Sequence, residues 1–203
     1  MSDHSLEALV RLIEARSGQQ DRFIIALAGP PGAGKSTTAH RLADQLGDAD
    51  ILQADGYHFD NVILDRLGRR HRKGAPDTFD IDGLASMLQR IRAREEVMTP
   101  VFDRELDLAR GAAGLLRPEV KYVVVEGNYL ALSEGPWARL RPLFDLVAMI
   151  DVPEEELRRR LTRRWSDLGH SEAEITQHVD GNDMLNVALV REQSRDCDFI
   201  LRS

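Results

Sequence analysis

Hydrophobic residues along this chain follow two different spacings. Apolar residues recur every three or four positions over residues 5–16, which predicts an amphipathic helix that ends at Gly18. Residues 23–28 instead form a short continuous apolar run, which is typical of a strand buried on both faces. The two patterns then alternate, with helices predicted at 35–46, 81–95, 137–141, 153–168 and 184–194 and strands at 51–54, 122–125, 146–150 and 199–201. Strands interleaved with helices in this way predict a parallel sheet covered by helices.

The alternation breaks between Val97 and Arg117. Short strand candidates at 100–102 and 115–116 lie around glycines there, which indicates an inserted hairpin over residues 97–117. We find no internal repeat, low-complexity tract or linker. We therefore expect one domain over residues 1–203, with an α/β fold of three layers. Its sheet would be mainly parallel with about five strands, with helices on both faces and the small hairpin inserted.

Composition narrows the class of protein. The 203 residues include 27 Lys and Arg against 34 Asp and Glu, which gives a net charge of −7, and 42% of the residues are hydrophobic. These proportions are typical of a soluble globular protein. The acidic total argues against nucleic acid as a partner, because bulk binding to nucleic acid depends on positive charge. Only Lys35, Lys73 and Lys121 are lysines, so the other 24 basic residues are arginines.

Signals for membranes and disulfides are also missing from the sequence. No apolar run approaches the roughly 18 residues that span a bilayer. Residues 1–4 lack the basic and apolar regions of a signal peptide. We therefore expect a cytoplasmic protein without a membrane partner. The single cysteine, Cys197, excludes an intramolecular disulfide and every multi-cysteine metal site.

A phosphate-binding motif follows the first predicted strand directly. Residues 29–36 fit the pattern G-x-x-x-x-G-K-[ST] in full and lead straight into the next predicted helix. The glycines allow successive backbone N–H groups to point inward, and the helix presents its positive end to the same phosphates. Lys35 would reach the β- and γ-phosphates, and the Ser36 hydroxyl would ligate Mg²⁺. The sequence therefore predicts a P-loop NTPase fold with a nucleoside triphosphate–Mg²⁺ site.

Two classes of P-loop protein remain open, a kinase that acts on a second substrate and a switch-type NTPase. A GTPase requires the guanine-reading motif N-K-x-D, and no asparagine in this chain precedes a lysine. The second predicted strand ends near Asp55, and parallel sheets hold their ligands at the carboxyl ends of the strands. Asp55 is thus placed to accept the proton of an attacking hydroxyl or to orient it. An Asx-type cap at the strand end is the alternative role.

Six motifs in a fixed order resemble those of a known kinase group. They are Ala-Gly-Pro-Pro-Gly-Ala-Gly-Lys-Ser-Thr at 28–37, Asp-Gly-Tyr-His at 55–58, Pro-Asp-Thr-Phe-Asp at 76–80, Pro-Val-Phe-Asp at 100–103, Val-Glu-Gly-Asn-Tyr at 125–129 and Arg-Leu-Thr-Arg-Arg at 160–164. The chain resembles the uridine kinase, phosphoribulokinase and bacterial pantothenate kinase group from about residue 20 to 201. Within that group it is most similar to the bacterial branch described as fructose, or sugar-transport-associated, kinases. The resemblance implies an ATP-dependent phosphotransferase with an alcohol group as acceptor.

The resemblance also assigns roles to individual residues. It makes Asp55 the catalytic base, in agreement with the argument from the strand end. It gives Asp80 the task of holding substrate hydroxyls, although Asp80 could equally cap the predicted helix that follows. Glu126 would face Mg²⁺ or the substrate, with a solvent-exposed strand-end acid as the alternative. The residues expected to bind ATP are Gly29, Pro30, Pro31, Gly32, Ala33, Gly34, Lys35, Ser36 and Thr37, and those expected to bind the acceptor are Asp55, Tyr57, His58, Asp80, Phe102, Arg104, Glu126 and Asn128.

Basic residues concentrate in two further segments. In the family, the arginines of the 160–164 motif belong to a lid that closes over the transferring phosphoryl group, here within residues 154–170. The lid candidates are Arg160, Arg163 and Arg164. The alternative is a solvated helix face, because residues 154–156 are glutamates that could pair with Arg158, Arg159 and Arg160 at i,i+4. The second basic run, 69–73, would bind a substrate phosphate or shape a lid, and a solvated loop is the alternative.

The hairpin motif departs from the uridine kinase pattern. Phe102 remains, but a second aromatic residue is replaced by Arg104 and a histidine by Asp107. A pocket that gains charge and loses aromatic surface suits a polyol better than a flat base. We therefore expect a sugar such as fructose as the acceptor, then a nucleoside such as uridine, then pantothenate. Assembly as a homodimer is left open.

Overall fold

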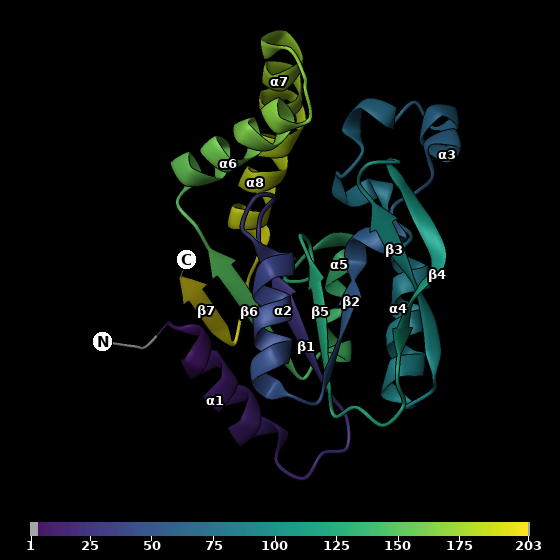
Figure 1. Cartoon of the computed structure of the whole chain (residues 1–203), viewed down its shortest axis with the longest axis vertical. Coiled ribbons are helices and arrows are strands. Elements are labelled where there is room, and N and C mark those ends of the chain that lie inside the picture. The colour runs from purple at the N-terminus through teal and green to yellow at the C-terminus, as the bar shows by residue number, and fades with distance from the viewer. Residues whose placement is uncertain (1–3, 203) are drawn as a thin grey trace.

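The centre of the protein, seen in a computed structural model that describes residues 4–202, is a five-stranded parallel sheet (Figure 1). Its strands lie in the order β2-β5-β1-β6-β7. Their bounds are β1 (Phe23–Ala28), β2 (Ala49–Gln53), β5 (Tyr122–Gly127), β6 (Leu146–Asp151) and β7 (Phe199–Arg202). The predicted α/β fold with a mainly parallel sheet is confirmed.

Both faces of the sheet are covered, because the central strands are apolar on both sides. Every residue of β1 and of β5 is buried. On one face the sheet packs against α4 (Ile81–Arg92), α5 (Gly135–Ala138) and part of α8 (Met184–Gln193). On the other face it packs against α1 (Leu6–Ser17), α2 (Lys35–Leu46) and α6 (Glu154–Asp167). Continuous hydrophobic runs are the sequence pattern that such two-sided burial requires.

The predicted hairpin is also present, as the antiparallel pair β3 (Val97–Asp103) and β4 (Leu108–Leu116). Both strands are longer than the sequence suggested. β4 in particular includes an exposed, glycine-containing stretch that has no apolar pattern of its own. Figure 1 shows this hairpin and α3 (Asn61–Arg66) rising on one side of the carboxyl ends of the sheet, with α6 and α7 (Glu172–His178) on the other side.

Several short elements were not predicted from the sequence. Among them are α3, α7 and a π-helical turn at Val179–Asp183 that joins α7 to α8. α7 begins with a complete capping box formed by Ser171 and Glu174. The π-helical turn is held against α6, since the Trp165 indole donates to Asp183 at 2.7 Å and stacks on His178.

The charge pairing expected along α6 is wrong in part. Arg160 does pair with Glu156 at 2.6 Å in the expected i,i+4 arrangement. Arg159, however, pairs with the same glutamate at i,i+3, and Arg158 pairs with Asp180 on the π-helical turn. Glu156 therefore pairs with two arginines, while Arg158 pairs with a carboxylate outside the helix.

Among residues 4–202, no helix is both long enough and apolar enough to cross a membrane.

Candidate functional site

The loop between β1 and α2 has the backbone geometry of a phosphate-binding loop. Gly32 and Gly34 have φ angles of +80° and +84°, which L side chains rarely adopt. A Cβ on Gly32 would also come within 3.2 Å of the Leu161 side chain of α6, so this helix packs closely on the loop. Gly34 is the N-cap residue of α2, which places the positive end of the helix beside the loop.

Lys35 is buried at the first position of α2 and projects back over the loop. Its ammonium group donates to the carbonyl of Pro30 at 3.1 Å. Burial lowers the pKa of Lys35, an effect that the negative charges of Glu126 and Asp55 oppose. An ammonium group held in this way is costly without an anionic partner, so the loop is built to receive one.

Glu126 lies at the carboxyl end of β5, between the phosphate-binding loop and Asp55. Its carboxylate accepts a hydrogen bond from the Ser36 hydroxyl at 3.0 Å and is almost fully buried. Burial and the nearby charge of Asp55 raise the pKa of Glu126, against the opposing effect of Lys35. The strand order β2-β5-β1 explains this meeting, because the carboxyl ends of three adjacent parallel strands deliver Asp55, Glu126 and Lys35 to one edge.

Asp55 follows β2 in a short 3₁₀ turn, Ala54–Tyr57. Its carboxylate accepts a hydrogen bond from Arg104 of the hairpin at 3.0 Å. Burial alone would raise the pKa of Asp55, but the positive charges of His58, Arg104 and Lys35 together hold it below its usual value. Asp55 is therefore ionised at neutral pH and faces the lysine of the phosphate-binding loop.

Gly56 permits the hairpin to dock directly against the turn that carries Asp55. A Cβ on Gly56 would lie 2.3 Å from the backbone carbonyl oxygen of Pro100 in β3. That contact is with backbone rather than with a movable side chain, so the hairpin would have to shift to accommodate it.

We expect Gly56→Ala to destabilise the protein by about 1–3 kcal/mol, the range for overpacked sites, and to lower activity by displacing the hairpin. Gly111→Ala is the matched control, because a Cβ on Gly111 of β4 meets nothing within 4 Å. Urea unfolding of both variants would measure the difference. Equal unfolding midpoints for the two variants would contradict the close docking.

Three aromatic rings pack together beside Asp55. The His58 ring lies 4.0 Å from the Phe79 ring and 4.8 Å from the Phe102 ring, centroid to centroid. The Nδ1 atom of His58 is 2.7 Å from the carbonyl oxygen of Asp55, which fixes the ring against the turn. Burial lowers the pKa of His58, an effect that the negative charge of Asp55 opposes. The structure thus brings the predicted residues His58 and Phe102 together with Asp55.

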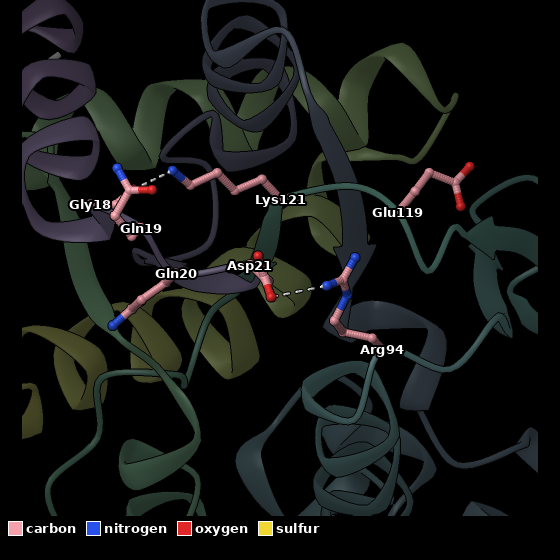
Figure 2. A pocket seen from close by; sticks show the side chains of 7 residues that line it. All are labelled: Gly18, Gln19, Gln20, Asp21, Arg94, Glu119 and Lys121. Carbon is pink, nitrogen blue, oxygen red and sulfur yellow. Dashed lines mark hydrogen bonds and ion pairs between the residues drawn. The ribbon is translucent and has the colours of Figure 1, made fainter.

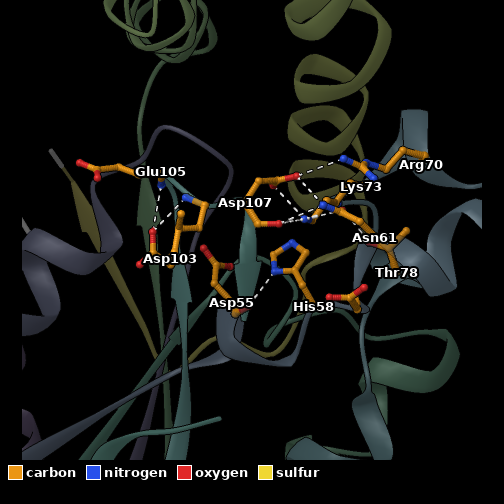
Figure 3. Close-up of polar contacts among 12 residues, drawn as sticks. Asp55, His58, Asn61, Arg70, Lys73, Thr78, Asp103, Glu105 and Asp107 are labelled. Carbon is orange, nitrogen blue, oxygen red and sulfur yellow. Dashed lines mark hydrogen bonds and ion pairs between the residues drawn. The ribbon is translucent and has the colours of Figure 1, made fainter. Parts of the chain in front are cut away.

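The basic loop 69–73 is tied to the hairpin tip through Asp107 (Figure 3). Lys73 forms an ion pair with Asp107 at 2.8 Å, and the Asn61 amide donates to the same carboxylate at 3.1 Å. Arg70 lies 3.7 Å from it. The loop therefore closes one side of the site through the residue that replaces the expected histidine.

The same loop is tied to the far side as well, through residues that sequence reasoning missed. The Arg72 guanidinium donates to the carbonyl of Gly181 at 2.9 Å, and the Asn182 amide donates to the carbonyl of Lys73 at 2.8 Å. Asn186 of α8 accepts a further bond from Arg72. No sequence motif marks Asn182 and Asn186, because their partners are a backbone carbonyl and an arginine side chain in a loop far away in the sequence.

The three arginines predicted to belong to a lid have different surroundings. Arg160 pairs with Glu156 and donates to the Gly32 carbonyl at 3.3 Å, so it touches the phosphate-binding loop. The Arg163 side chain is 75% exposed and pairs with Asp167. Arg164 is partly buried, and within residues 4–202 no carboxylate lies at ion-pair distance from it. Burial lowers the pKa of Arg164, an effect that the negative charges of Asp183 and Asp55 oppose.

Three other predicted residues lie less centrally. The Asp80 carboxylate accepts from the Gly83 backbone at 2.8 Å and caps α4, which is the alternative role considered for it. Tyr57 is buried, and its hydroxyl is without a hydrogen-bond partner among the described residues. Asn128 is half-buried just beyond the end of β5.

Magnesium fits the oxygen donors at the loop. The Ser36 hydroxyl and the Glu126 carboxylate lie 3.0 Å apart and are the hard donors that Mg²⁺ prefers. In the described part of the chain no group of three or more His, Cys, Asp or Glu residues could hold a metal alone. This composition suits an ion that takes few protein ligands and shares phosphate oxygens with a nucleotide.

An open hollow of about 270 Å³ lies at the other end of the sheet, before β1 and β5 (Figure 2). Polar residues line it, with an ion pair between Arg94 and Asp21 at 3.3 Å. It contains none of the predicted site residues. Parallel sheets bind their ligands at the carboxyl ends of the strands, so we place the functional site at the phosphate-binding loop.

Known proteins share both this sequence and this fold. A sequence model described as the phosphoribulokinase / uridine kinase family matches residues 24–203. The "Putative uridine kinase" of Schizosaccharomyces pombe is 32% identical, over 95% of this chain and 87% of that protein. The pantothenate kinase of Rhodococcus opacus is 30% identical over 75% of this chain, which spans 51% of that enzyme. The crystal structure of a "putative fructose transport system kinase" from Silicibacter sp. TM1040 superimposes with a TM-score of 0.93 and 33% identity, covering 98% of this chain and 99% of that one.

Proposed function

The chain belongs to the phosphoribulokinase/uridine kinase family and is a phosphotransferase with a hydroxyl acceptor; from that premise we propose that it transfers the γ-phosphoryl group of ATP to a sugar-like molecule. The observation that carries the proposal is the meeting of Lys35, the Ser36–Glu126 pair and Asp55 at one edge of the sheet. A phosphate-binding cation and an ionised carboxylate that can face an acceptor hydroxyl are what this reaction requires.

Each residue has a defined task in the proposed reaction. Asp55 orients the acceptor hydroxyl and accepts its proton as the oxygen attacks the γ-phosphorus. The bond from that phosphorus to the β–γ bridging oxygen breaks, and ADP leaves with the electron pair. Lys35 and Arg164 stabilise the negative charge on the transferring group. Ser36 and Glu126 would hold Mg²⁺, which supplies charge neutralisation between the phosphates when bound.

The hairpin supports a sugar such as fructose as the acceptor. The positions that would have supplied a second aromatic face and a histidine instead hold Arg104, bonded to Asp55, and Asp107, bonded to Lys73. Phe102 is left as the aromatic surface of the hairpin next to His58. A polyol gains from such charged hydrogen-bonding groups, whereas a nucleobase needs flat stacking partners. Uridine and pantothenate remain the alternative acceptors, since relatives bear those names.

The test is ADP production from ATP–Mg²⁺ in the presence of fructose and other sugars, uridine or pantothenate. Stimulation by a sugar above the basal rate supports the proposal, and stimulation by uridine or pantothenate alone would replace the acceptor class. Steady basal hydrolysis with no stimulation by any acceptor would instead favour a switch-type NTPase, the alternative from another class.

The surroundings of the lid arginines give a second test. We expect Arg164→Met to lower kcat by about 100- to 1,000-fold, the cost of losing one preorganised charge on a transition state. Arg163→Met is the matched control, because Arg163 is exposed and paired with Asp167. Steady-state rates of both variants would show the difference. A larger loss from Arg163→Met would show that Arg164 is the wrong arginine for the phosphate contact.

A further inference from the structure

Arg104 occupies an unusual position for a surface arginine. It follows β3 at the tip of the hairpin, and its guanidinium contacts the carboxylate that we propose as the catalytic base, at 3.0 Å. The two side chains differ in exposure, since Asp55 is 19% exposed and Arg104 is 58% exposed. Arg104 therefore stands at the entrance to Asp55, with part of its surface in solvent.

Most of the hydrogen-bonding capacity of Arg104 is unused. A guanidinium carries five N–H donors in a planar fork that binds carboxylates or phosphates through two parallel bonds. The contact with Asp55 uses one nitrogen, Nη2, on one oxygen. Within the part of the chain that the structure describes, Asp55 is the only carboxylate at ion-pair distance from Arg104. The remaining donors are free to receive a second anion.

Two other cations beside the hairpin are already paired. Lys73 is neutralised by Asp107, and Arg110 of β4 pairs with Asp103 at 3.4 Å. The hairpin tip itself is braced, because the Asp103 carboxylate accepts from the backbone N–H groups of Glu105 and Leu106 (Figure 3). Arg104 is thus a charged fork held on an ordered turn beside the reacting position.

We propose that Arg104 is the receptor for an anionic group on the acceptor, and that its ion pair with Asp55 is the resting arrangement which such an acceptor opens. This inference rests on the proposed kinase function and narrows its substrate class to a polyol that carries a carboxylate or a phosphate. A neutral acceptor has to reach Asp55 past an intact ion pair. An anionic acceptor offers Arg104 a replacement partner, so the Asp55 carboxylate becomes free for the hydroxyl while neither charge is left unpaired.

The first experiment compares kcat/KM for fructose, fructose 6-phosphate and gluconate with saturating ATP–Mg²⁺. We expect at least one anionic acceptor to exceed fructose by about 10- to 100-fold, which corresponds to one hydrogen-bonded charge contact. The two anionic compounds distinguish a phosphate from a carboxylate as the recognised group. Turnover of fructose with no gain for either anion would overturn the inference and leave the kinase function standing. No turnover of these three compounds, of other sugars, of uridine or of pantothenate would overturn both.

The second experiment removes the charge. We expect Arg104→Met to lower kcat/KM for the preferred anionic acceptor by about 10- to 100-fold, and to lower that for fructose by a much smaller factor. Arg104→Lys should restore part of the anion preference. Arg110→Met, a hairpin arginine that does not touch Asp55, is the matched control and should retain the preference. An equal loss with neutral and anionic acceptors in Arg104→Met would mean that Arg104 only positions Asp55, and would overturn the inference.

Discussion

Lys35→Ala should lower phosphoryl transfer by about 1,000-fold or more, since it removes the main protein charge on the transferring group. The fold should survive the change. Removal of Lys35 relieves the desolvation of a buried ammonium group, but it also leaves Glu126 and Asp55 without that compensating positive charge. Because these two effects oppose each other, thermal unfolding without ATP should change little, while the stabilisation that ATP–Mg²⁺ gives the unmodified protein should be lost.

Lys121→Ala is the control for that experiment. Lys121 is half-buried at the other end of the sheet and donates to the carbonyl of Gly18 at 2.9 Å. Its loss should leave both turnover and nucleotide stabilisation unchanged. Residual turnover close to normal in Lys35→Ala would mean that the phosphate contact comes from elsewhere in the loop.

Asp55→Asn should lower kcat by about 100- to 10,000-fold, the usual contribution of a general base, with little effect on ATP affinity. The amide oxygen can still accept the hydrogen bond from Arg104, so the site should keep its shape. The pKa of Asp55 is lowered from its usual value. The carboxylate is therefore ionised at any pH above this lowered pKa, and it is lost as a base only when the pH falls through that pKa. The rate of the unmodified enzyme should therefore stay constant down to mildly acidic pH and fall only as Asp55 is protonated. The variant has no carboxylate at this position, so its rate should not show that fall.

Asp77→Asn provides the comparison for Asp55→Asn. Asp77 is an exposed carboxylate that pairs with Arg69, so its neutralisation should change turnover little. Isothermal titration with a non-hydrolysable ATP analogue would separate binding from chemistry in both variants. The assignment of the base fails if Asp55→Asn turns over at nearly the normal rate, or if the entire loss is in nucleotide affinity.

The sequence predicts best those parts of the fold that depend on a residue pattern within one short segment. β1 is found at the predicted residues because a run of six buried apolar residues ended by Gly-Pro-Pro-Gly has few alternatives. The phosphate-binding loop is similarly determined by its glycines. α3, α7 and the π-helical turn were missed because they are short and carry few apolar residues at helical spacing.

The candidate site shows the same division. Strand-end position placed Asp55 and Glu126 near Lys35, since that follows from sheet topology. The ion pair between Arg104 and Asp55 joins residues 49 positions apart on separate elements, and no local pattern encodes it. The links from Arg72 and Asn182 to backbone carbonyls are equally invisible, because any residue supplies a carbonyl and the sequence does not show which ones meet.

Because Gly56 contacts Pro100, substitutions at Gly56 have different consequences from substitutions at the hairpin tip. The hairpin contacts the turn that carries Asp55 through backbone atoms, so its position depends on the absence of a side chain at Gly56 rather than on which residues form the hairpin tip. Residues such as Arg104 can therefore change without disturbing how the hairpin is seated. A scaffold of this kind can exchange one acceptor for another through a few substitutions at the tip, while the phosphate chemistry below is inherited unaltered.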